Sequence, residues 1–206
     1  MLAPPPYFPS NQSDLLEYTR RFAEESPLPV LLYNMPSHSK TEFDVATVRR
    51  LMHEVPNIVG IKDSSGKMPY FQQLVELAGE REGFSVLMGP EELLAASVLM
   101  GGHGGVCGGA NLVPSLYCEL YEAALTEDLR VLHKLQHRVQ RLSAKLYTVG
   151  DPPNAYLTGL KAALQLTGLC SGRLAEPLFA LSEERQRIIA QHLRDLGIEL
   201  ASTAAS

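Results

Sequence analysis

Short apolar runs alternate with amphipathic stretches over the first 125 residues of the chain. The apolar runs predict strands at residues 1–3, 30–33, 57–62, 84–88 and 104–107. Between them, apolar residues recur every three or four positions, which predicts helices from Ser10 onward and at residues 44–54, 68–78, 91–100 and 114–125. Strands that are apolar throughout and alternate with helices are typical of parallel sheets covered by helices. The pattern therefore predicts an α/β fold of five strand–helix units.

The remaining residues carry a different pattern, with helical periodicity and no strand-like run. Helices are predicted at residues 130–147, 154–166 and 182–196. We therefore expect residues 1–126 to hold the five strand–helix units and residues 127–206 to form a C-terminal helical segment of three helices.

Five units do not close a (β/α)8 barrel, which needs eight strands. The pattern fits either an open doubly wound sheet or the C-terminal part of a TIM barrel, about strands 4 to 8. Residues 1–3 look like the end of a buried strand that runs into the proline-rich loop after it. This start favours the partial barrel and a truncated gene model.

Composition limits the functional classes. Charged residues make up 20% of the chain, hydrophobic residues 45%, and the net charge of −5 is spread thinly. This predicts no nucleic-acid or anionic-membrane surface, and no apolar run is long enough to span a bilayer. The three cysteines are isolated, so no zinc site, other metal cluster or disulfide framework is expected. The N-terminus lacks the features of a signal peptide, and we expect a cytoplasmic protein that needs no cofactor.

The candidate chemistry lies where two successive strands end. In parallel α/β folds the reactive groups sit at the carboxyl ends of the strands, and here these ends carry Tyr33 and Lys62. If the two strands are neighbours, their axes lie about 4.8 Å apart. The two side chains could then reach one small ligand.

A lysine after the apolar run 58–61 is unusual, because lysine is seldom buried without a partner. Apolar surroundings favour the neutral amine, which is the form that attacks a ketone to give an imine. The alternative is a lysine that reaches solvent or pairs with Asp63. Spacing alone leaves both interpretations of Lys62 open.

Two other features carry weaker signals. His38 and His103 lie in polar loops, where a lone histidine is usually solvated. The glycine-rich run 101–109 lacks the spacing of a phosphate-binding loop. Glycines at a strand end favour close approach of the backbone to a ligand or tight packing.

Three motifs carry a resemblance to a known family. Leu32-Tyr-Asn-Met-Pro-Ser37, Val59-Gly-Ile-Lys-Asp-Ser-Ser65 and Gly101-Gly-His-Gly-Gly-Val106 resemble the dihydrodipicolinate synthase and N-acetylneuraminate lyase family. This group of class I aldolases is built on the (β/α)8 barrel. The order and spacing of the motifs agree over essentially the whole chain.

The resemblance implies roles for single residues. Lys62 would form the imine with a 2-oxo acid substrate, typically pyruvate, and Tyr33 would shuttle protons. Gly89 and the backbone at Val106 would line the pocket around the lysine. The C-terminal helices match the family's extra helical segment, and members of the family are commonly homotetramers.

Three departures from the family pattern bear on the substrate. The Gly-x-Thr-Thr/Ser-Gly-Glu loop that holds the substrate carboxylate is absent from this chain. The second tyrosine of the family's Pro-Tyr-Tyr segment is Phe8, and the arginine that clamps a second carboxylate is His38, which leaves His38 as the candidate for substrate binding there. Histidine cannot make the bidentate contact of arginine. These changes favour another 2-oxo acid aldolase or dehydratase over a synthase of lysine biosynthesis.

Two hypotheses follow. The first is a lyase or aldolase that acts through an imine on Lys62. The second is a catalytically inactive remnant of the family, or an assembly partner, that lacks the carboxylate-binding loop.

Overall fold

The computed structural model describes residues 1–201. Its sheet has four parallel strands in the order β1-β2-β3-β4. They are β1 (Val30–Asn34), β2 (Ile58–Asp63), β3 (Ser85–Met88) and β4 (Gly104–Gly105). Leu2 adds a single parallel bridge to Leu32 on the outer side of β1. The α/β prediction is thus confirmed for this sheet, although the first predicted strand is only a bridge and the last is two residues long.

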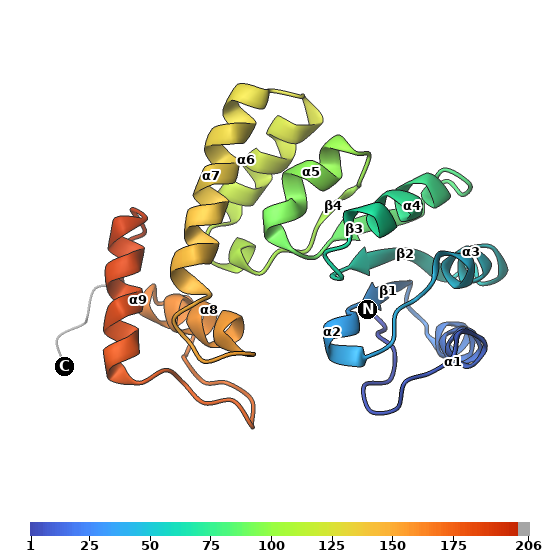
Figure 1. Ribbon diagram of the computed structural model, residues 1–206, viewed down its shortest axis with the longest axis horizontal. Coiled ribbons are helices and arrows are strands. Elements are labelled where there is room, and N and C mark those ends of the chain that lie inside the picture. Colours follow the sequence, from blue (N-terminus) through green and yellow to red (C-terminus); the bar gives the residue numbers. More distant parts are fainter. Residues whose placement is uncertain (202–206) are drawn as a thin grey trace. The chain divides into compact units, whose positions relative to one another are not determined.

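Helices follow the strands in the predicted alternation. They are α1 (Gln12–Glu25), α2 (Pro36–Ser39), α3 (Val45–Glu54), α4 (Met68–Ala78), η1 (Glu91–Leu93) and α5 (Leu94–Leu99). Figure 1 shows α1, α3, α4 and α5 following one another along the same side of the strands. Asn11 and Asp44 cap α1 and α3 by accepting a backbone N–H through their side chains. The short α2 was not predicted, because its four residues are too few to show a helical period, although proline is favoured in the first turn of a helix.

Burial alternates along the strands, so the sheet has two different faces. In β1 the side chains of Val30, Leu32 and Asn34 are buried, whereas those of Leu31 and Tyr33 are half-buried. The buried face packs against the helices and carries the core. The largest fully buried side chains of this core come from both the strands and the helices and include Phe43, Phe71, Phe84, Leu32, Leu51, Met52, Ile58, Ile61, Leu74, Leu77 and Met88. The half-buried face carries Tyr33 and Lys62.

The chain divides into two compact units. The first comprises residues 1–107 and 124–127, and the second comprises residues 108–123 and 128–201 of the described chain. The predicted boundary at residue 126 stays a prediction. All residues of the candidate site belong to the first unit.

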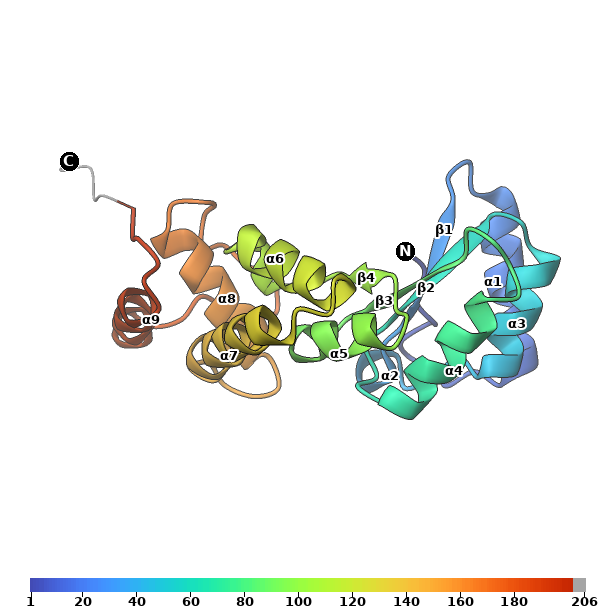
Figure 2. The same ribbon diagram turned by 90° about the horizontal axis from the view of Figure 1, so that it is seen from above.

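The C-terminal part is helical, as the sequence predicts. Its elements are η2 (Gly109–Asn111), α6 (Pro114–Leu125), α7 (Leu129–Leu146), α8 (Ala155–Leu166) and α9 (Glu183–Asp195). Figure 2 shows α7, α8 and α9 as separate helices, with α9 seen nearly along its axis. At Gly159 in α8 a Cβ atom would lie 1.9 Å from the carbonyl oxygen of Leu146, so only glycine allows this close approach to α7. Within residues 1–201, no helix combines the length and the apolarity that a membrane crossing needs.

Candidate active site

Tyr33 and Lys62 are neighbours across β1 and β2. Their Cα atoms are register partners in the parallel ladder, and Lys62 Nζ lies 4.5 Å from the centroid of the Tyr33 ring. Both side chains are half-buried on the same face of the sheet. The two strands are therefore neighbours, which was the condition for Tyr33 and Lys62 to reach one ligand. A lysine amine over a tyrosine ring is a favourable contact, and it places the amine and the phenol within reach of one small molecule.

The strands extend one residue beyond the predicted ends. Asn34 and Asp63 close β1 and β2, and their side chains point to the opposite, fully buried face. Asn34 Nδ2 donates to Asp63 Oδ1 at 2.8 Å. The ion pair between Lys62 and Asp63 that the sequence left open is therefore not formed. Asp63 uses its carboxylate behind the sheet, while Lys62 projects in front of it.

The Asp63 carboxylate has a second source of hydrogen bonds. Ser65 donates to it twice, from its backbone N–H at 3.0 Å and from its Oγ at 2.9 Å. Burial nevertheless raises the pKa of Asp63 above its ordinary value, since these hydrogen bonds only partly offset the loss of water.

The Tyr33 hydroxyl makes a hydrogen bond to a sulfur atom. It donates to Met35 Sδ at 2.8 Å. A thioether is a weak acceptor, so a substrate oxygen or a water molecule can replace it at little cost. The role of Tyr33 in proton transfer stays a prediction.

Gly89 and Val106 lie just after β3 and β4, close to the ends of those strands. The Gly89 N–H donates to the Asp63 carbonyl at 2.7 Å, and a Cβ atom at this position would lie 1.9 Å from Ser64 Oγ. The Val106 N–H donates to the Met88 carbonyl at 2.9 Å. The backbones of both residues therefore continue the hydrogen-bond ladder of the sheet. That Gly89 and the backbone at Val106 line a pocket stays a prediction.

His38 lies apart from this pair, in α2. Its side chain is exposed, and its Nδ1 is 2.9 Å from Ser37 Oγ. The structure shows no contact between His38 and the other predicted residues. Its role in binding a substrate stays a prediction.

The sequence matches the model of the Dihydrodipicolinate synthetase family over residues 1–196. The chain belongs to this family. The resemblance found in the three motifs is thereby confirmed, and with it the α/β fold of the family.

Known relatives agree with this assignment. A 4-hydroxy-tetrahydrodipicolinate synthase of Methanosarcina mazei is 33% identical over 198 residues, which are 96% of this chain and 66% of that protein. The structure of dihydrodipicolinate synthase from Bacteroides thetaiotaomicron is 44% identical, with a TM-score of 0.88 over 94% of this chain and 64% of that one. The chain thus spans about two thirds of the length of the curated relatives it matches.

A third relative was solved with a ligand. It is an E. coli K12 prophage protein of the dihydrodipicolinic acid synthase family, in complex with pyruvate. It is 25% identical to this chain, with a TM-score of 0.85 over 96% of this chain and 65% of that one. The family thus includes a member that binds a 2-oxo acid.

Sequence reasoning missed the residues behind the site. Asn34 and Asp63 lie within the motifs, but the sequence analysis did not assign them to a face of the sheet. The strand period of two contains that signal, because a residue next to a front-facing side chain must face the back. Applied to Tyr33 and Lys62, it places Asn34 and Asp63 together on the buried face.

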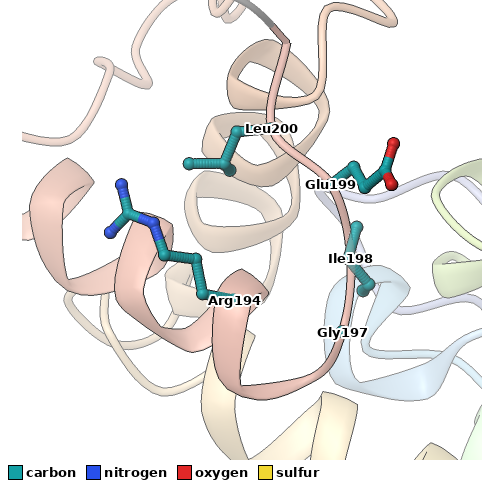
Figure 3. A pocket seen from close by; sticks show the side chains of 5 residues that line it. All are labelled: Arg194, Gly197, Ile198, Glu199 and Leu200. Atoms are coloured by element: carbon teal, nitrogen blue, oxygen red, sulfur yellow. The ribbon is translucent and has the colours of Figure 1, made fainter.

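Two pockets of the described chain lie outside the predicted site. Figure 3 shows one of about 490 Å³, which is lined by Arg194, Gly197, Ile198, Glu199 and Leu200. The Arg194 and Glu199 side chains extend in different directions there. The other, of about 540 Å³, is lined by residues 10, 12, 40–45, 70 and 73. Neither is lined by a residue that the sequence singled out.

Cys107 lies close to the site but is a poor nucleophile. Its thiol is buried after β4, and burial raises the pKa of the thiol to about 12. The nearby positive charge of Lys62 lowers this pKa only in part. A thiol with such a pKa is protonated at neutral pH. Cys107 therefore does not compete with Lys62 as the predicted nucleophile.

Proposed function

We propose that this chain is a Schiff-base-forming lyase or aldolase that acts on a 2-oxo acid, with Lys62 as the nucleophile and Tyr33 as the proton shuttle. The observation that carries the proposal is the contact of 4.5 Å between Lys62 Nζ and the Tyr33 ring. Family membership supports it, as does the binding of pyruvate by a relative. The substrate class is that of pyruvate-type 2-oxo acids.

The chemistry needs only the two side chains for its first steps. The neutral Lys62 amine attacks the C2 carbonyl carbon, the C=O π bond opens, and a proton passes from the new ammonium nitrogen to the carbonyl oxygen to give a carbinolamine. Tyr33 supplies a proton to the departing hydroxyl, water leaves, and a C=N bond forms. Loss of a proton from C3 then gives an enamine that forms a C–C bond with an aldehyde. In the reverse direction the same enamine is the product of C–C cleavage.

Two residues of the chain bear on the identity of the second substrate. The curated relatives are named 4-hydroxy-tetrahydrodipicolinate synthase, but Phe8 and His38 differ from the tyrosine and arginine expected of the synthases. Phe8 cannot relay a proton, and His38 cannot clamp a carboxylate with two parallel hydrogen bonds. We therefore favour an aldehyde or sugar acid partner other than that of the synthases.

The proposal extends to architecture and setting. The four strands and the Leu2 bridge would be strands 4 to 8 of a (β/α)8 barrel, with α7, α8 and α9 as a helical extension. The protein would assemble as a homotetramer and act in the cytoplasm without a cofactor.

The decisive experiment is borohydride trapping. The 206-residue protein is incubated with pyruvate and sodium borohydride, digested, and analysed by peptide mass spectrometry. The proposal expects a reduced pyruvyl adduct on Lys62 and none on Lys67, whose exposed amine pairs with Glu42 at 2.7 Å. A Lys62 peptide that stays unmodified while the protein is folded contradicts the proposal. That outcome favours a catalytically inactive family member or an assembly partner.

A further inference from the structure

The side chain of Asn34 joins three segments behind the candidate site. Its Nδ2 donates to Asp63 Oδ1 at 2.8 Å, and its Oδ1 accepts the backbone N–H of Phe43 at 3.2 Å. Asn34 and Asp63 are both fully buried. Because Phe43 follows α2, one amide group connects the end of β1, the end of β2 and the loop after α2.

Asp63 extends this connection to a third strand. Its carboxylate accepts both hydrogen bonds from Ser65, and its carbonyl accepts the N–H of Gly89 just after β3. Asn34 and Asp63 are also the last register pair of β1 and β2. Beyond them, the Ser64 N–H donates to the Asn34 carbonyl at 2.7 Å. The Asn34–Asp63 pair therefore fastens the strand ends at the point where the ladder passes into loops.

Tyr33 and Lys62 stand one residue before this pair, on the opposite face. A shift of Asn34 relative to Asp63 must separate the Tyr33 ring from the Lys62 amine, since the backbone carries all four side chains. A buried polar pair is costly to leave unsatisfied, so the hydrogen bonds resist such a shift. An apolar pair at the same place would fill the space without fixing the spacing.

We propose that Asn34, held by Asp63, is a positioning residue that sets the distance between Lys62 and Tyr33 for imine formation. This inference rests on the proposed function of Lys62. It assigns a task to the buried face, which touches no substrate. A misplacement of about 1 Å can slow an enzymatic step by about 100-fold, so a small loosening of the pair is measurable.

The test is the isosteric variant Asn34→Asp. It keeps the acceptor for Phe43 but puts an oxygen where the donor to Asp63 was, so two carboxylates face each other. We expect borohydride trapping of pyruvate on Lys62 to slow by about 10- to 100-fold per folded molecule at neutral pH. At mildly acidic pH the two carboxyls share a proton and reform a hydrogen bond. The ratio of the variant rate to the wild-type rate should then rise as the pH falls.

One variant serves as the control. Asn57→Asp is the same substitution at the amino end of β2, where Asn57 Nδ2 donates to the carbonyls of Ala23 and Ser26 at 2.7 and 3.1 Å. It should lower the thermal stability and leave trapping per folded molecule unchanged at every pH.

The outcomes separate the two proposals. A wild-type protein that is not labelled overturns the proposed function and this inference with it. Labelling of Asn34→Asp at the wild-type rate, with a pH-independent ratio, overturns the positioning role alone. If Asn34→Asp does not fold at neutral pH, Ser65→Ala takes its place, since it removes one of the Ser65 hydrogen bonds to Asp63. We expect this variant to slow trapping by about threefold, and an unchanged rate overturns the positioning role.

Discussion

The two faces of the sheet at the carboxyl ends of β1 and β2 differ in burial and in the strength of their contacts. The front face presents Tyr33 and Lys62, which are half-buried and make weak contacts, one to a ring and one to a sulfur atom. The back face presents Asn34 and Asp63, which are fully buried and hydrogen-bonded to each other, to Phe43 and to Ser65. Weak contacts leave a group free to exchange partners with a substrate. Strong buried contacts fix the backbone that carries it.

The difference follows from the strand period of two, which puts the proposed reactive side chains on one face and the buried hydrogen-bonded pair on the other. Adjacent residues of one strand point to opposite faces, so the reactive residue and the residue that fixes it can be neighbours in the sequence. Mutations on the two faces should accordingly have different effects. Changes to Tyr33 and Lys62 in front should alter the chemistry and spare the stability, whereas truncation of an apolar core side chain behind should mainly lower the stability.

The largest effect is expected for Lys62→Met, which removes the amine and keeps an unbranched side chain of similar length. Trapping of pyruvate should fall by at least about 1,000-fold, since the substitution removes the nitrogen that forms the C–N bond in the proposed reaction. The thermal midpoint should stay close to that of the wild type, because the residue is half-buried and outside the core. Peptide mass spectrometry and circular dichroism measure the two quantities. Residual labelling at the wild-type rate would move the nucleophile to another lysine.

The next effect contrasts two adjacent leucines of β1. Leu32 is fully buried on the back face, and Leu31 is half-buried on the front face, over Gly60. Leu32→Ala should lower the free energy of unfolding by about 2–5 kcal/mol through the cavity it leaves. Leu31→Ala should cost less than about 1 kcal/mol, because water fills the space. Denaturant unfolding of both variants gives the comparison, and equal losses would mean that the front face is as closely packed as the back.

Much of this arrangement was predictable from the sequence, and the limits have physical causes. The alternation of apolar runs and helical periods predicts the strands that carry Tyr33 and Lys62 and the helices between them, because apolar runs bounded by amphipathic stretches carry a strong signal. The predicted strand at residues 104–107 shrinks to Gly104–Gly105, since glycine contributes no side chain to the ladder. The contacts of Asn34 with Phe43, nine residues along the chain, depend on the path of the loop after α2, which no local pattern encodes.

Tyr33→Phe tests whether the front face holds a proton shuttle as well as a nucleophile. The variant keeps the ring beneath Lys62 and removes only the hydroxyl, whose partner is Met35 Sδ. Imine formation should slow by about 100-fold, the lower end of what a positioned acid or base contributes. Stability should hardly change, because the lost hydrogen bond is to a weak acceptor. The rate is measured from trapping reactions that are stopped at successive times. A change of less than about twofold would assign the proton transfers to water.

The smallest effect is a dependence of stability on pH that belongs to the back face. Burial raises the pKa of Asp63 in the folded protein above its ordinary value. For such a carboxyl, the stabilising contribution is fully present below the pKa of the unfolded chain, and it is lost as the pH rises through the higher folded pKa. The free energy of unfolding of the wild type should therefore fall relative to that of Asp63→Asn as the pH is raised from strongly acidic to neutral. Urea unfolding of the two proteins over this range measures the difference. A wild-type protein that gains stability relative to Asp63→Asn would mean that the hydrogen bonds from Asn34 and Ser65 outweigh the loss of water, and that the back face holds a carboxylate more firmly than its burial suggests.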